Sequence, residues 1–151
     1  MKRKPFAVVA ALLLALSCTE PYPAVSGDWR YASSLTYPSD YSLPGGPPYV
    51  CSYTGRLTLG QNSGIFDGTY DSLAISCSSG GVSSGFNGTV INGTLTRDGI
   101  VAFAFDTPSW LSVGTLHGDS MGGSVTDSVS GLSGMELASG TWSACKGRVC
   151  K

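Results

Sequence analysis

The chain has 151 residues, of which 42% are hydrophobic and only 13% are charged, with a formal net charge of −1. This length suits one domain, and the apolar share is sufficient for a core. Lys2, Arg3 and Lys4 supply three of the 9 basic residues, so the rest of the chain carries a net charge of −4 and has no basic stripe for nucleic acid.

The N-terminal segment has the layout of a secretory signal. Three basic residues precede an apolar run of 11 residues from Phe6 to Leu16, and a small residue follows before Cys18. A membrane-spanning helix needs about 20 apolar residues, so we expect this segment to be cleaved rather than retained. Cleavage by an ordinary signal peptidase, followed by plain secretion, is one interpretation.

Cys18 ends the sequence Leu-Ala-Leu-Ser-Cys, which resembles a bacterial lipobox. The resemblance implies a lipoprotein signal peptide over residues 1–17, acylation of Cys18 with palmitate-type chains, and a tether over residues 18–26. Several acyl chains anchor a protein stably, whereas one does so only marginally. By lipoprotein sorting rules, Thr19 after the cysteine implies the outer membrane of the cell envelope.

From Gly27 onward, short runs rich in Val, Ile, Thr, Tyr and Phe are broken by Gly, Asn, Asp and Pro, a pattern that predicts strands and turns. No stretch with a helical period exceeds about two turns. The apolar phase slips between Tyr70 and Leu73, which indicates a bulge. The predicted strands are 27–36, 49–59, 65–77, 86–96, 100–106, 111–117, 120–127 and 135–144.

Sequential strands with short hairpins predict an all-β fold, a single antiparallel up-and-down barrel of about eight strands over residues 27–151. An open sheet would have two exposed edges, and pairing the last strand with the first removes both. Similar Ser-Gly-x-Trp segments end at Trp29 and Trp142. We expect these two residues to be neighbours where the barrel closes.

Gly27-Asp28-Trp29 resembles the Gly-x-Trp motif that opens the first strand of lipocalins and of avidin-type barrels. Residues 85–127 and 140–144 resemble a class of small bacterial lipoproteins. These resemblances imply a calycin-type barrel that holds a small ligand. The Thr-Asp-Tyr motif of lipocalins is absent, and the pattern with which avidins hold biotin is not recognisable. The resemblance therefore implies the barrel shape and not a particular ligand.

Four cysteines remain after Cys18, and export would place them in an oxidising compartment. Of three pairings, we predict Cys51–Cys77, near the open end of a hairpin, and Cys145–Cys150, which closes a small loop. In the loop-closure model these contribute about 3 and about 2 kcal/mol. A metal site is the alternative, but a single histidine and the lack of a C-x-x-C pair disfavour it. We predict no metal and no cofactor.

Aromatic side chains are the one feature with which such a barrel could bind a ligand. An eight-stranded barrel is just wide enough to be filled by its own side chains. A packed core is therefore one interpretation, and a cavity for an apolar or aromatic ligand is the other. Phe86 is also expected to face the barrel interior, and Trp110, which follows a turn, is expected at the rim of the barrel. The predicted ligand-lining residues are Trp29, Tyr31, Tyr53, Tyr70, Phe103, Trp110 and Trp142.

Catalysis is not indicated. His117 is the only histidine, and Asp119 lies across a turn from it, which disfavours a Ser-His-Asp triad. Asp67 and Asp71 on one strand face would be about 13 Å apart, too far for a glycosidase pair. We expect no enzyme, but a monomeric lipid-anchored envelope barrel that binds a small apolar or aromatic ligand. A structural or surface-interaction domain is the alternative, and a hydrolase ranks third.

Overall fold

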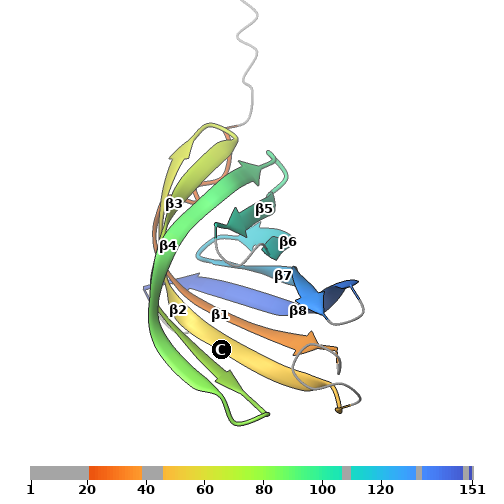
Figure 1. Ribbon diagram of the computed structural model, residues 1–151. Coiled ribbons are helices and arrows are strands. Elements are labelled where there is room, and N and C mark those ends of the chain that lie inside the picture. Colours follow the sequence, from red (N-terminus) through yellow and green to blue (C-terminus); the bar gives the residue numbers. More distant parts are fainter. Residues whose placement is uncertain (1–20, 39–45, 107–109, 132–133, 148–149, 151) are drawn as a thin grey trace, which may run out of the picture.

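The computed structural model describes residues 21–38, 46–106, 110–131, 134–147 and 150, and these form eight strands and no helix. They build one all-β closed barrel (Figure 1). All eight predicted strands are present, and several extend beyond their predicted ends. The strands are β1 Gly27–Tyr37, β2 Tyr49–Asn62, β3 Ile65–Cys77, β4 Val82–Leu95, β5 Ile100–Phe105, β6 Trp110–His117, β7 Ser120–Gly131 and β8 Gly134–Lys146.

β1 closes the barrel because it pairs with both β2 and β8. Each strand is antiparallel to its neighbours in the chain, so the predicted up-and-down order and the closure are confirmed. The segments that carry Trp29 and Trp142 are neighbours where the barrel closes, as expected, but the two tryptophans are not directly opposite each other. Trp29 is opposite Lys146 and Trp142 is opposite Ser33, because β8 is displaced along β1 relative to the matched sequence segments.

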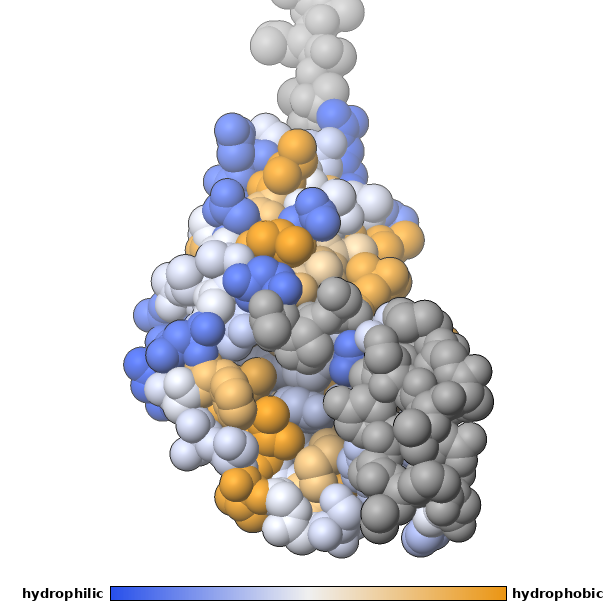
Figure 2. Space-filling model, in the orientation of Figure 1, coloured by the Kyte–Doolittle hydropathy of each residue, from blue (hydrophilic) through white to orange (hydrophobic). Residues whose placement is uncertain are grey.

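Side chains alternate between the interior and the outer wall, as the two-residue period of a strand requires. In β1 the inward residues are Trp29, Tyr31, Ser33, Leu35 and Tyr37, all at most 6% exposed. The other strands add aromatic and aliphatic side chains to the same continuous core. On the face shown in Figure 2, apolar residues stand in small groups between polar ones. The main apolar surface of the sheet therefore faces inward.

A bulge in β3 lies where the apolar phase of the sequence slips. The β3–β4 register shifts between Tyr70 and Leu73, and Ser72 has a φ of 54°. The Ser72 N–H donates a hydrogen bond to Asn87 Oδ1 at 3.0 Å, which supports this conformation. The bulge keeps both Tyr70 and Leu73 buried although they are three residues apart. The predicted bulge is confirmed.

The two ends of the barrel differ in their connections. At one end, which we term the closed end, short turns join β2 to β3, β4 to β5, and β6 to β7. Residues before β1 also pack there. The Val25 N–H donates to Gln61 Oε1 at 2.7 Å, and Trp29 Nε1 donates to the Val25 carbonyl oxygen at 2.8 Å. The opposite end, the loop end, carries the 38–48 connection between β1 and β2.

Both predicted disulfides are present. Cys51–Cys77 joins residues that are directly opposite on β2 and β3 at the loop end, and Cys51 is buried. Cys145–Cys150 ties the residues after β8 back to that strand. One bridge therefore fixes the loop end of a hairpin, and the other fixes the C-terminal segment.

The predicted signal peptide and Cys18 lie outside the described residues, which begin at residue 21. Of the predicted tether, Val25 is completely buried at the closed end, so packing starts two residues before β1. In the part of the chain that the structure describes, no helix is long and apolar enough to cross a membrane.

Candidate functional site

The aromatic residues predicted to line the interior all point inward, and none is more than 6% exposed. Six of the seven belong to one network of ring contacts, in which Phe105 is central. The Phe105 ring centroid lies 5.5 Å from that of Tyr31, 4.7 Å from Tyr70, 5.8 Å from Phe103 and 4.9 Å from Trp110. These rings would supply apolar walls for a bound molecule.

Trp29, the seventh predicted residue, belongs to the closed end instead. Its indole N–H is bonded to the Val25 carbonyl oxygen, and Lys146 Nζ lies 4.9 Å from the ring centroid. Such a cation–π contact holds the ring in place at the end of the barrel. Trp29 therefore seals this end, and its one polar atom is satisfied within the protein.

Two expectations about individual aromatic residues are wrong. Trp110 is 1% exposed rather than at the rim, because the inward phase of β6 turns its ring against Tyr53, with 4.8 Å between centroids. Phe86 is 45% exposed rather than inward. It lies in the first part of β4, from Val82 to Asn87, which is exposed on both faces because β5 pairs with β4 only from Val90 onward.

Polar side chains occupy inward positions among these rings. Ser33, Ser112 and Asp127 are at most 6% exposed and are the buried polar or charged residues among those described. Hydroxyl or indole groups of four aromatic neighbours lie beside them. We term the whole set the buried polar cluster; its members are Tyr31, Ser33, Tyr37, Tyr53, Trp110, Ser112 and Asp127.

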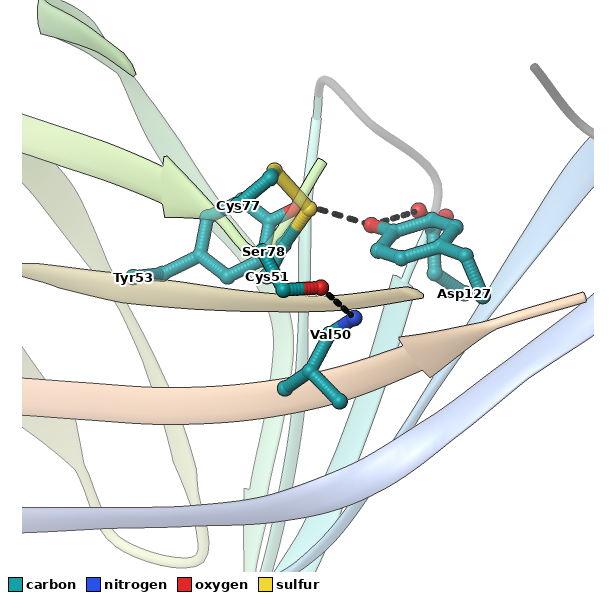
Figure 3. Close-up of a disulfide and its surroundings, with 7 residues drawn as sticks. Val50, Cys51, Tyr53, Cys77, Ser78 and Asp127 are labelled. Atoms are coloured by element: carbon teal, nitrogen blue, oxygen red, sulfur yellow. Dashed lines mark hydrogen bonds between the residues drawn. A yellow bond between two sulfur atoms is a disulfide. The ribbon is translucent and has the colours of Figure 1, made fainter. Parts of the chain in front are cut away.

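A chain of hydrogen bonds crosses the cluster from β2 to β7. The hydroxyl oxygens of Tyr37 and Tyr53 are 2.5 Å apart, and the Tyr37 hydroxyl donates to Asp127 Oδ2 at 3.2 Å. A phenol has one proton to donate, so Tyr53 is the donor in its bond with Tyr37. Figure 3 shows Tyr53 next to the Cys51–Cys77 disulfide, with Asp127 on the other side of this chain.

Five buried polar atoms have no hydrogen-bond partner in the described part of the chain, and all five belong to the cluster. Buried polar groups are nearly always hydrogen-bonded, and an unpaired one costs about 1–3 kcal/mol. Their concentration in one place marks a site able to bond a further polar group. The atoms are Tyr31 Oη, Ser33 Oγ, Trp110 Nε1, Ser112 Oγ and Asp127 Oδ1.

Three of these atoms are hydroxyls, and two of them, from Ser33 and Ser112, lie near that of Tyr31. Burial raises the pKa of Tyr31, and the nearby hydroxyls of Ser33 and Ser112 lower that pKa by a smaller amount. Both serine hydroxyls are therefore close to the Tyr31 oxygen, yet neither completes a hydrogen bond with it. Because Ser33 lies on β1 and Ser112 on β6, the two serine hydroxyls approach the Tyr31 oxygen from different parts of the barrel wall.

Charge in the cluster depends on Asp127. Burial raises the pKa of its carboxyl group, and the hydrogen bond from Tyr37 opposes this by a smaller amount. Burial likewise raises the pKa of Tyr37, with further contributions from Tyr53 and Asp127. The phenols of Tyr31 and Tyr37 are neutral at pH 7 and act as hydrogen-bonding groups. Asp127 carries the carboxyl group of the cluster, and its burial favours the neutral form of that group.

The residues considered for catalysis lie apart from the cluster. His117 is exposed at the closed-end terminus of β6, and Asp119 is exposed in the turn that follows. Asp67 lies on the exposed outer face of β3, and Asp71 is half-buried near the bulge. Among the residues that the structure describes, no group of three or more His, Cys, Asp or Glu side chains could hold a metal ion.

Comparison with known proteins adds no relative: no protein-family model matches the chain, and no curated protein matches its sequence. The closed eight-strand antiparallel barrel is consistent with the lipocalin-like architecture that the Gly-x-Trp resemblance implies. What the interior can bind must therefore be inferred from the cluster itself.

Four members of the cluster were not predicted as lining residues: Ser33, Tyr37, Ser112 and Asp127. A signal for them exists in the sequence. Ser33 has the same phase as Tyr31 within one predicted strand, and Ser112 has the phase of its buried neighbour Trp110. A polar residue at an inward position must find a hydrogen bond or leave a costly unpaired group. The sequence does not give the cross-barrel distances that bring these positions together.

Proposed function

We propose that the barrel binds a small molecule with an aromatic or apolar body and a polar head, without catalysis. The observation that carries the proposal is the set of five unpaired buried atoms in the buried polar cluster. Binding sites for small molecules are mostly apolar, with a few placed polar groups that fix orientation. The ring network around Phe105 supplies the first property, and the cluster supplies the second.

The donors and acceptors of the cluster define the head group. Trp110 Nε1 can only donate, Asp127 Oδ1 accepts when ionised, and the hydroxyls of Tyr31, Ser33 and Ser112 can do either. An amide would match this set, because its carbonyl oxygen would accept from the hydroxyls and its N–H would donate to Asp127 Oδ1. An uncharged head is favoured, because burying a further unpaired charge is costly.

A filled barrel with a structural or surface-interaction role is the second candidate. The observation that favours it is the close ring packing around Phe105, with all lining aromatic residues buried. In such a barrel the unpaired hydroxyls would lower the stability of the fold and would bind no ligand. The two candidates predict opposite responses to small polar aromatic molecules.

Aromatic amides compared with matched hydrocarbons test this proposal. Benzamide and 2-naphthamide are expected to raise the Tm and to quench tryptophan fluorescence, because they pair the unpaired atoms, whereas toluene and 2-methylnaphthalene have smaller effects. Ser112→Ala should remove the difference, and Ser124→Ala on the exposed outer face of β7 should retain it. If no probe changes Tm or fluorescence, the barrel is filled and the binding proposal fails.

We also propose that the domain is attached to the outer membrane through lipid on Cys18. The lipobox resemblance supports this, as does the pairing of the other four cysteines into two disulfides, which leaves Cys18 as the odd one. Metabolic labelling with radioactive palmitate in a bacterial host provides the test. The chain should be labelled and membrane-bound, and Cys18→Ser should be unlabelled; label retained in that variant would refute acylation at Cys18.

A further inference from the structure

A hollow on the outer wall lies outside the buried polar cluster. It has a volume of about 310 Å³ and is formed mainly by β8, β1 and β2, which are side by side in the barrel (Figure 1), with Ser72 of β3 and Cys150 at its border. Its wall contains small side chains, among them Ala32, Thr54 and Ser143. The β2–β3 register shifts between Thr54 and Arg56, and the residue between them, Gly55, lines the hollow with its backbone.

Two arginines border this hollow. Arg30 on β1 and Arg56 on β2 are directly opposite each other, and both are exposed. Like charges at opposite positions of neighbouring strands destabilise a sheet. No carboxylate among the described residues forms an ion pair with either arginine. Asp71 is opposite Arg56 on β3 without pairing with it, and Asp28 Oδ1 accepts a hydrogen bond from Thr58.

The hollow continues along the wall in both directions. Next to it lies a shallower hollow of about 400 Å³, whose lining includes the hydroxyl side chains of Ser34, Ser52 and Thr141. On the other side, Arg30 and Arg56 also border a hollow of about 180 Å³, which Asp28, Trp29 and Gly147 line as well. The arginine pair therefore lies in a groove whose wall on one side carries hydroxyl groups.

We propose that this groove binds a phosphate group between Arg30 and Arg56, carried by a sugar or by a lipid headgroup. Guanidinium groups present paired N–H donors that match phosphate oxygens. One guanidinium group can form two hydrogen bonds with a carboxylate and balance its single negative charge. Two guanidinium groups carry two positive charges, which balance the two negative charges of a phosphate monoester. Binding would also remove the repulsion between the arginines. The hydroxyls along the groove can bond the molecule that carries the phosphate. This site is separate from the interior, and neither proposal requires the other.

Calorimetric titration with glucose 6-phosphate, and with glucose as the uncharged match, tests the site in low salt. The phosphorylated sugar is expected to bind and glucose to bind much less. The double variant Arg30→Gln/Arg56→Gln should weaken binding at least 10-fold. Arg97→Gln is the matched control, since Arg97 lies over the Tyr22 ring at the closed end. Equal binding by the double variant and the control would overturn the proposal.

Further arms separate the sources of the phosphate. With the Cys18→Ser chain, inorganic phosphate alone and vesicles of phosphatidic acid, compared with phosphatidylcholine, are titrated in the same way. Binding to phosphatidic acid vesicles only, lost in the double variant, assigns the site to a lipid headgroup; binding of the soluble phosphates assigns it to a free or sugar phosphate. If none of the phosphate probes binds, the groove is not a phosphate site.

Stability gives an independent readout that needs no ligand. Because the arginine charges repel each other, Arg56→Gln should raise the Tm at low ionic strength, and 1 M salt should abolish the gain by screening. An unchanged Tm at low salt would show that the two charges are already compensated, and the proposal would fail.

Discussion

Asp127 couples the buried polar cluster to pH. Its Oδ2 accepts a hydrogen bond from Tyr37, and its Oδ1 has no partner in the described part of the chain. Burial raises its pKa, so the native state keeps the carboxyl proton to a higher pH than the unfolded chain, whose aspartate pKa is about 3.9. Its contribution to stability is therefore complete below that pH and is lost as the pH rises through the raised pKa.

Replacing Asp127 with Asn should remove this dependence. Asn can still accept from Tyr37 but cannot ionise, so Asp127→Asn should increase the free energy of unfolding at pH 7. The gain should shrink toward pH 4. Urea denaturation at pH 4, 5, 6 and 7 measures it, with Asp119→Asn in an exposed turn as control. A variant whose stability follows the same pH profile as the wild type would contradict the raised pKa.

Ser112 offers a second test at the residue scale, because its hydroxyl is completely buried and unpaired. Removing a buried polar atom without a partner relieves a desolvation penalty, so Ser112→Ala should leave the free energy of unfolding unchanged or raise it by about 1 kcal/mol. Val125→Ala, also in the core, should instead lose about 2 kcal/mol through the cavity it leaves. Thermal unfolding compares the two; a loss in Ser112→Ala would mean that its hydroxyl has a partner.

At the scale of strands, alternation of apolar residues predicted all eight elements and the β3 bulge. The alternation failed to predict a strand segment that forms by pairing with a neighbouring strand and has no apolar pattern of its own. Val82 to Gly85 is a polar, glycine-containing start to β4 with no apolar alternation, yet Val82 and Ser83 pair with Ser76 and Ile75 of β3. The register of β8 on β1 could not be predicted either, because the similar segments around Trp29 and Trp142 indicate neighbouring strands but not which residues are opposite each other.

Gly140 is the position at which the β1–β8 seam is most sensitive to substitution. A Cβ there would overlap the Ser34 carbonyl oxygen and lie 2.7 Å from the Ser34 carbonyl carbon, both of which are backbone atoms. Gly140→Ala should therefore force the seam apart and cost about 3 kcal/mol or more. Gly81→Ala is the matched control, because a Cβ at Gly81 meets nothing within 4 Å. Equal urea midpoints for the two variants would contradict the close approach of β8 to β1.

At the scale of the whole molecule, the sequence predicts a closed barrel but not its site. Closure follows from the number of strands, their short connections and the need to remove exposed edges. The buried polar cluster joins β1, β2, β6 and β7, and its contacts depend on the side chains that happen to meet across the interior. Tyr31, Tyr53 and Trp110 were predictable from size and phase, whereas Ser33 and Asp127 stand out only once the opposite wall is in place.

The two disulfides should differ in what they contribute to the whole chain. Cys51 and Cys77 are 26 residues apart, and Cys145 and Cys150 are 5 apart. Loop-closure entropy predicts a loss of about 3 kcal/mol for Cys51→Ala/Cys77→Ala and about 2 kcal/mol for the other pair.

The first bridge also lies next to Tyr53 at the loop end (Figure 3). Its removal should therefore weaken the benzamide-induced rise in Tm, while Cys145→Ala/Cys150→Ala should preserve that rise. Urea denaturation combined with the amide titration measures both effects. Equal losses of stability in the two variants would show that the Cys51–Cys77 bridge restricts the unfolded chain no more strongly than the Cys145–Cys150 bridge. An unchanged amide response in both variants would show that the Cys51–Cys77 bridge does not support the polar cluster.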